Sequence, residues 1–160
     1  AEHDGPVYLR FGRPSVPVFM PEDQKFEIGK AIHLTEGSDV TIVATGHLVW
    51  EALEASKALF EKGIKAEVIN IHTIKPLDEK AILDSVAKTK CIVTAEEHNY
   101  LGGLGESVAR VLAENEPTPQ EFIATQDTFG ESGTPAQLMD KYGLNSSAII
   151  NAVEKVMKRK

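Results

Sequence analysis

The sequence of 160 residues contains a single cysteine, Cys91. One thiol excludes an internal disulfide and a cysteine-rich zinc site, and it is typical of proteins of the reducing cytoplasm. The chain also lacks an apolar run of the roughly 20 residues that a membrane-spanning helix needs. Its first residues, AEHDG, are polar and acidic, so they predict no signal peptide. They contain no initiator methionine, so we expect the chain to be a piece of a longer protein.

Basic residues are in the minority. The 17 lysines and arginines stand against 24 aspartates and glutamates, which gives a formal net charge of −7. An acidic surface repels phosphate backbones, so nucleic acid and anionic membranes are poor candidate partners. The remaining composition, 42% hydrophobic and 26% charged, is that of an ordinary globular domain.

The first part of the chain differs from the rest. Residues 7–11, VYLRF, alternate in the manner of a short strand, and three prolines follow at positions 14, 17 and 21. Proline disfavours a helix and lacks the N–H group that pairs strands in a sheet, so this stretch predicts an extended linker. A strand without an obvious partner, followed by a stiff linker, indicates that residues 1–23 are the tail of a preceding domain. The compact domain is then expected over residues 24–160.

Strands and helices are predicted to alternate beyond Gln24. Short apolar runs bounded by turn residues indicate strands at residues 31–35, 40–45, 66–71, 91–95 and 121–125. Helical spacing indicates helices from about residue 49 to Gly63, from Pro76 to about Lys88, from Leu104, from Pro135 to Gly143, and through residues 149–157.

This alternation predicts an α/β fold with parallel βαβ units and right-handed crossovers. The first two strands are joined by only four residues, 36–39, which are too few for a parallel crossover. The first strand should therefore run antiparallel, in a three-layer α/β/α domain with a mixed sheet. The expected core comprises Ile42, Val43, Leu53, Phe60, Val68, Ile69, Ile92, Val93, Val108, Leu112, Ile123 and Val153.

Polar residues gather where the strands end, the usual place for ligands in open α/β sheets. Histidines 47, 72 and 98 and the carboxylates of Glu96 and Glu97 are the candidate metal ligands. We interpret them instead as loop residues that cap buried strands. The positions of the three histidines in the sequence do not indicate that their rings share one metal ion. Adjacent residues of a strand point to opposite faces, so the two glutamates cannot form an acid/base pair.

The glycine-rich loop at residues 102–105, GGLG, follows a strand and opens a helix, as in dinucleotide sites. The match fails in detail, since Val108 stands where the third glycine belongs. Glu106 would also repel a phosphate at the helix N-terminus. We therefore favour close backbone packing as the reason for these glycines. Cys91 is interpreted as a structural thiol in a buried strand.

Several stretches together resemble one family. Residues 5–13, GPVYLRFGR, resemble the last strand of the pyrimidine-binding domain of transketolase-like enzymes. The family's C-terminal domain is resembled, in order along the chain, by VTIVATG at 40–46, NIHTIKPLD at 70–78, TAEEHN at 94–99, GGLG at 102–105 and DTFGESG at 127–133. The closest likeness is to the C-terminal subunit of split transketolases.

The resemblance implies a sheet of order 1-3-2-4-5 with strand 1 antiparallel. It also implies an enzyme that uses thiamine diphosphate and Mg²⁺ to move a two-carbon ketol unit between phosphorylated sugars. Both cofactors would be bound by an N-terminal subunit or domain and by the pyrimidine-binding domain, because no residue of this chain matches their ligand motifs. The fragment alone would be inactive and would mainly support assembly of a homodimer.

One site residue is carried over from the resemblance: Arg13 aligns with an arginine that contacts the substrate phosphate in transketolases. Arg10 has no such match, and without the resemblance both arginines are interpreted as solvated charge. The alternative enzymes are 1-deoxy-D-xylulose-5-phosphate synthase and the β-subunits of 2-oxo acid dehydrogenases, which share this domain. A non-catalytic regulatory or ligand-binding domain that uses the strand-end histidines is the alternative of another class.

Overall fold

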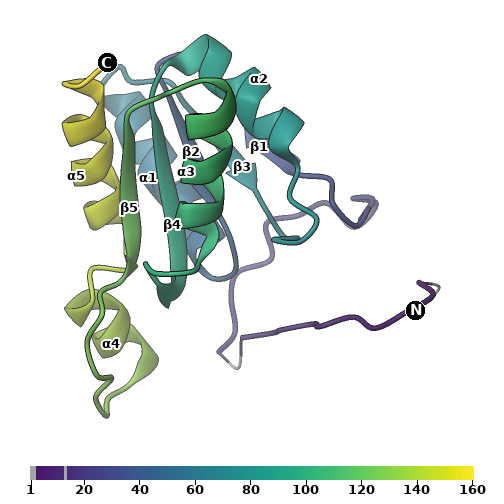
Figure 1. Ribbon diagram of the computed structural model, residues 1–160. Helices are drawn as coiled ribbons and strands as arrows, with labels where there is room; N and C mark the ends of the chain where they lie inside the picture. The colour runs from purple at the N-terminus through teal and green to yellow at the C-terminus, as the bar shows by residue number, and fades with distance from the viewer. Residues whose placement is uncertain (1–2, 13) are drawn as a thin grey trace.

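The computed structural model describes residues 3–12 and 14–160, and its centre is a five-stranded mixed sheet (Figure 1). The strand order is β1-β3-β2-β4-β5. β1 pairs antiparallel with β3, and the other pairs are parallel, which confirms the predicted topology. The strands are β1 Ile32–Thr35, β2 Val40–Ala44, β3 Ala66–Asn70, β4 Ile92–Asn99 and β5 Gln120–Thr125.

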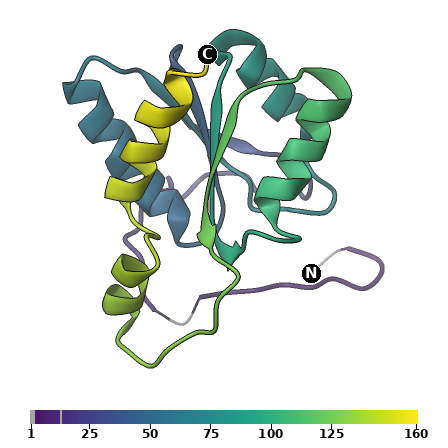
Figure 2. The ribbon, with the colours of Figure 1, turned by 60° about the vertical axis from the view of Figure 1, so that its left-hand side comes forward.

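Helices cover both faces of the sheet, which gives the three predicted layers. Figure 2 shows α1 and α5 together on one side and α2 and α3 on the other. Each pair closes its own hydrophobic cluster against the sheet. The helices are α1 Leu48–Glu61, α2 Glu79–Thr89, α3 Leu104–Asn115, α4 Pro135–Lys141 and α5 Ser146–Met157.

Most helix ends follow the predicted signals, but the start of α2 does not. Thr134 and Gln137 form the predicted capping box, and Gly63 has a positive φ of 81° just after α1. α2 begins at Glu79 and not at Pro76, so that prediction was wrong. The reason is that the Asp78 side chain accepts a hydrogen bond from the Ala81 N–H and caps the helix there.

β4 extends four residues beyond the predicted end at Ala95, to Asn99. Beyond Ala95 its register with β5 shifts, and pairing resumes where Asn99 meets Thr125. The extension places Glu96 and Glu97 within a strand and not in the following loop, so their side chains leave opposite faces of the sheet.

The predicted core is correct at nine of its twelve positions and wrong at Phe60. Phe60 is 67% exposed, whereas its neighbour Leu59 is completely buried. Leu59 stands seven residues after Ala52, two turns along the buried stripe of α1, and one further residue rotates Phe60 by about 100° away from it. Leu53 and Ile123 are only partly buried.

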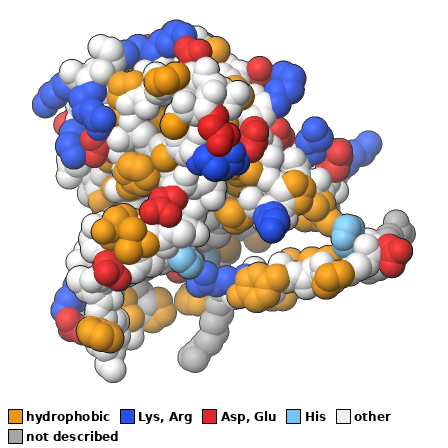
Figure 3. Space-filling view, viewed as in Figure 1, with side chains coloured by type: hydrophobic (Ala, Val, Ile, Leu, Met, Phe, Trp, Pro, Cys, Tyr) orange, Lys and Arg blue, Asp and Glu red, His pale blue; other side chains and the backbone are white. Residues whose placement is uncertain are grey.

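The N-terminal segment runs along the outside of the domain. Residues 7–11 form no strand with any described part of the chain, so the predicted short strand is absent here. Their apolar side chains are exposed, and Figure 3 shows apolar side chains along this arm. Phe19, further along, packs on the core, with its ring centroid 6.1 Å from that of Trp50 on α1. Assignment of residues 7–11 to a preceding domain stays a prediction.

Leu59 and Phe60 provide a matched test of the core. Leu59→Ala should lower the free energy of unfolding by about 2–5 kcal/mol, because it leaves a cavity between α1 and the sheet. Phe60→Ala should cost about 0.5 kcal/mol or less, because the ring is mostly in water. Urea unfolding of both variants measures the difference. Equal losses of unfolding free energy in the two variants would show that α1 is rotated about its axis relative to its orientation in the structure.

Candidate functional site

The parallel strands all end at one edge of the sheet, the lower edge in Figure 1. The N-terminal segment passes below this edge, and the excursion that carries α4 extends from it after β5. Ligands of open α/β sheets collect at such an edge, so the side chains here are the candidates for function.

The three strand-end histidines do not converge on one centre. His72 packs against Phe26, with 4.4 Å between the ring centroids, and its Nδ1 lies 2.8 Å from Thr73 Oγ1. Burial lowers the pKa of His72, which favours the neutral ring. His98 instead directs its Nδ1 to the carbonyl oxygen of Asn99 at 2.8 Å.

His47 pairs with a carboxylate from the neighbouring strand. Its Nδ1 lies 3.3 Å from Oε1 of Glu97, and the two side chains are only 18% and 29% exposed. Gly46, with a φ of 61°, makes the turn that places His47 at the start of α1. Across residues 3–12 and 14–160, no group of three or more His, Cys, Asp and Glu side chains is arranged to hold a metal ion.

Glu96, on the opposite face of the sheet from Glu97, caps α3 although it lies eight residues before Leu104, the first residue of that helix. Its carboxylate is buried and accepts two backbone hydrogen bonds of 2.8 Å, from Leu104 N–H to Oε2 and from Gly105 N–H to Oε1. These two N–H groups belong to the first turn of α3 and have no acceptor within the helix. In other proteins, N–H groups at this position of a helix bind phosphate. The protein's own carboxylate therefore occupies the anion position of this helix.

The glycines of the loop at 102–105 permit this arrangement. A Cβ at Gly103 would overlap the carboxylate of Glu96, and a Cβ at Gly105 would lie 2.5 Å from Phe122 Cδ1. Glu106 holds the same loop, since its Oε2 accepts a hydrogen bond of 2.8 Å from Gly102 N–H. Close packing is thus confirmed as the role of Gly103 and Gly105. The Glu96 cap was missed because the sequence alone gave no partner for that carboxylate.

A second buried carboxylate, Glu67 on β3, was also missed. Glu67 is 2% exposed, and its oxygens lie 3.1 Å from His33 Nδ1 and 3.1 Å from Lys88 Nζ. Ser85 donates a further hydrogen bond to it from α2. The only signal in the sequence was a glutamate inside a predicted buried strand. Because its partners come from β1 and α2, the network ties these elements to β3 and serves the fold.

Cys91 is completely buried, and burial raises the pKa of its thiol. The Sγ donates a weak hydrogen bond of 3.4 Å to the carbonyl oxygen of Asp39. Both observations fit the predicted structural thiol, since a raised pKa keeps it protonated and unreactive.

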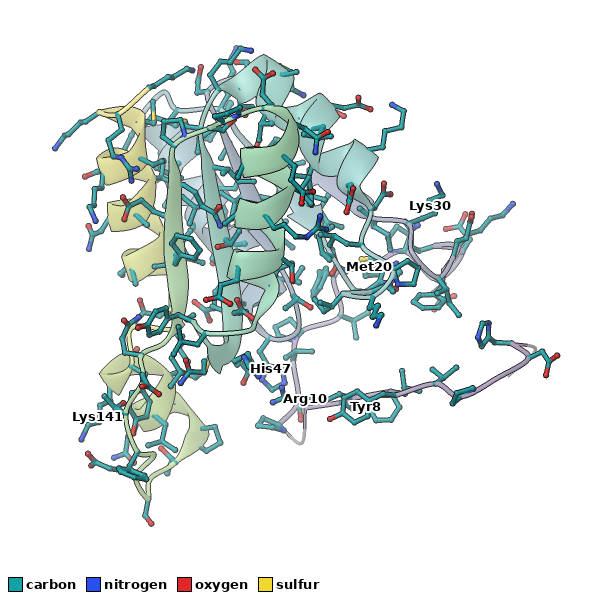
Figure 4. The ribbon with its side chains drawn as sticks, viewed as in Figure 1. Tyr8, Arg10, Met20, Lys30, His47 and Lys141 are labelled. Atoms are coloured by element: carbon teal, nitrogen blue, oxygen red, sulfur yellow. The ribbon has the colours of Figure 1, made fainter. Side chains whose placement is uncertain are left out.

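Arg13, the one substrate-binding residue expected from the resemblance, lies outside the described residues. Its neighbour Gly12 is described and lies directly against the ring of His47, where a Cβ would overlap Nε2. Arg10 is exposed, and Figure 4 shows it near His47 at this edge of the sheet. None of the helices formed by the described residues is long and apolar enough to cross a membrane.

Comparison with known proteins identifies a family match over most of the chain. Residues 29–149 match the family model described as "Transketolase, C-terminal domain". A 6-deoxy-6-sulfo-D-fructose transketolase subunit of Clostridium sp. (strain MSTE9) is 47% identical over 99% of this chain and 49% of its own length. A subunit of the apulose-4-phosphate transketolase of Phocaeicola vulgatus is 38% identical over 99% of this chain and 51% of its own length.

Other matches agree with this one. A 1-deoxy-D-xylulose-5-phosphate synthase of Geobacter sulfurreducens is 41% identical over 95% of this chain and 24% of its own length. A solved structure described as "Split gene transketolase, inactive beta4 tetramer" superposes with a TM-score of 0.87 at 44% identity, over 89% of this chain and 47% of the other. The chain thus spans about half the length, or less, of these relatives.

The Glu96 cap can be tested by stability. Glu96→Ala should lower the free energy of unfolding by about 2–4 kcal/mol, because it leaves two buried N–H groups of α3 without an acceptor. Glu106→Ala is the matched control and should cost about 1 kcal/mol or less, since its hydrogen bond is exposed. Denaturant unfolding compares the two. A small loss for Glu96→Ala would show that water replaces the carboxylate at the helix end.

Proposed function

The chain belongs to the transketolase C-terminal domain family, and we propose that it is the C-terminal part of a split transketolase. The complete enzyme then transfers a two-carbon ketol unit between phosphorylated sugars. The observation that carries this proposal is the match to the C-terminal domain over residues 29–149, together with relatives described as transketolase subunits of about twice this length.

Thiamine diphosphate and Mg²⁺ are assigned to other domains of the enzyme. The residues described here do not fit the cofactor, because Glu96 fills the one helix N-terminus that follows a glycine-rich loop. A diphosphate there would meet a buried carboxylate. We therefore place the cofactor between an N-terminal subunit and the pyrimidine-binding domain that would precede this chain.

The role left to this chain is assembly. Tyr8 and Phe11 are 90% and 79% exposed in an extended segment, as expected for a strand whose sheet belongs to a preceding domain. The solved relative is described as a tetramer of its β chains, which supports self-association; we propose a homodimer as the basic unit. The single buried cysteine supports a cytoplasmic location.

Arg13 is proposed to bind the anionic end of the substrate. The two named relatives act on a sulfonated and a phosphorylated sugar respectively, and both groups present tetrahedral anionic oxygens. The planar guanidinium matches such oxygens with two parallel hydrogen bonds. Arg13 follows Gly12, which lies at the edge of the sheet where the preceding domain would join.

Three alternatives are open to test. The Geobacter relative supports a 1-deoxy-D-xylulose-5-phosphate synthase as one enzyme alternative. A β-subunit of a 2-oxo acid dehydrogenase is the other enzyme alternative. A free regulatory or ligand-binding domain would instead bind a metal or nucleotide at His47, His72 or His98, and titration of the isolated chain with either ligand tests it.

The isolated chain should not bind the cofactor. Calorimetry with thiamine diphosphate and Mg²⁺ should give no saturable heat, whereas the assembled enzyme should bind both. Micromolar binding by residues 1–160 alone would contradict the assignment of the cofactor to other domains.

Arg13→Ala in the complete enzyme should raise KM for phosphorylated ketoses by about 10- to 150-fold, which corresponds to the roughly 1.5–3 kcal/mol of a charged hydrogen bond. Activity on an unphosphorylated ketose should hardly change, and kcat should stay near its original value if the contact is equal in ground and transition states. Arg10→Ala is the matched control, with little effect on either substrate. An equal loss on both substrates for Arg13→Ala would give Arg13 a structural role.

A further inference from the structure

The excursion between β5 and α5, residues 126–143, carries an aromatic side chain that this domain does not cover. Phe129 is 99% exposed. None of the seven described residues of α4, which lies in the same excursion, is buried. Tyr100 and Leu101, in the loop after β4, are 36% and 46% exposed. The excursion thus adds little to the core of the domain, and exposed apolar side chains on adjoining loops are typical of an interaction surface.

The backbone on both sides of Phe129 is held by polar contacts. Asn99 Nδ2 donates a hydrogen bond of 3.3 Å to Asp127 Oδ1, which joins the start of the excursion to the loop after β4. Tyr142 Oη donates one of 3.4 Å to the carbonyl oxygen of Phe129, and the capping box orders the start of α4. A segment that is ordered before it binds loses little conformational entropy on binding, which favours a docking role.

The arm, residues 3–12, lies on the same side of the domain as the excursion. Figures 1 and 2 show both of them beyond the carboxyl ends of the parallel strands. In Figure 4, Tyr8 on the arm and Lys141 on the excursion both lie below the sheet. Since the arm leads to the proposed preceding domain, that domain would lie beneath the edge from which the excursion projects.

The expected size of the preceding domain brings it within reach of the excursion. The two transketolase subunits among the relatives are about twice as long as this chain, which leaves a preceding domain of about the size of this one. A domain of roughly 150 residues is about 40 Å across, whereas residues 7–11 as a strand would span only about 17 Å of it. The domain would extend past both ends of the strand. Figure 1 shows the excursion beyond the end at which the arm joins this domain.

We propose that the excursion docks through Phe129 on the preceding domain of the same chain and fixes the angle between the two domains. The inference rests on the proposed function, in which residues 7–11 belong to that domain. With the arm alone, the linker at residues 14–23 would act as a hinge. The covalent link keeps the two surfaces at a high effective concentration, so a small apolar patch suffices. A second copy and the N-terminal subunit lack such a link, which favours the preceding domain as the occupant.

Photo-cross-linking in the complete enzyme identifies what covers Phe129. The enzyme is reassembled from equal amounts of unlabelled and isotope-labelled chains that carry Phe129→benzoylphenylalanine. The cross-links should join position 129 to the preceding domain, within chains of one label only. Phe60→benzoylphenylalanine is the matched control and should give no such link. Its ring is 67% exposed but lies in the last turn of α1, about 18 Å along the helix from the edge of the sheet.

An alanine variant measures the strength of the contact. In the complete enzyme, Phe129→Ala should make the amides of residues 126–134 exchange hydrogen at least about fivefold faster, because an aromatic anchor carries much of the energy of such a contact. Phe60→Ala should leave these rates unchanged. In the 160-residue chain, Phe129→Ala should not shift the midpoint of urea unfolding, since the ring contributes nothing to this domain.

The outcomes separate the possible occupants and separate this inference from the proposed function. Links between the two labels would assign Phe129 to the homodimer interface, and links to the N-terminal subunit would assign it there. Either result overturns the proposal, as does a yield no higher than that of the Phe60 variant. Ketol transfer by the unmodified enzyme is measured alongside. If it is absent, the proposed function fails, whereas the docking is decided by the cross-links and the exchange rates.

Discussion

The carboxylate of Glu96 lies buried between β4 and α3, and its two backbone hydrogen bonds determine the chemistry of this edge of the sheet. A helix N-terminus beyond a parallel strand is the usual anion site of α/β proteins. Here the anion is built into the chain, and Gly103 has no side chain because Glu96 needs the space. The arrangement orders the loop before α3 and also excludes a ligand phosphate.

Glu97, the next residue along β4, is directed to the other face of the sheet. Since side chains alternate along a strand, Glu96 is directed inward to α3 while Glu97 is directed to His47 and the N-terminal arm. One adjacent pair of carboxylates thus joins the interior of the domain to the surface along which the N-terminal arm runs. A slip of one residue in the register of β4 would turn each glutamate to the other face of the sheet, so the pairing of β4 with β2 supports both contacts.

The sequence predicted the architecture better than the contacts of its polar groups. The antiparallel first strand followed from the short link at 36–39, and the order of the strands was implied by the family resemblance. Helical spacing alone could not decide which of Leu59 and Phe60 is buried, because two adjacent apolar residues can both lie at the edge of the buried face of a helix. Polar partners escaped prediction because they are distant in the sequence. His47 meets Glu97 across 50 positions, so no local pattern marks the pair, and the ring could be placed at the correct edge but not oriented.

Several histidines and carboxylates of this domain are used by the fold itself. Glu96 caps a helix, Glu67 joins three elements, and His72 is packed against Phe26 with a lowered pKa. The His47–Glu97 pair is the exception in placement, because it faces the arm and not the interior. The ring edge of His47 lies against the backbone of Gly12, so this pair joins the edge of the sheet to the arm and does not stabilise the interior.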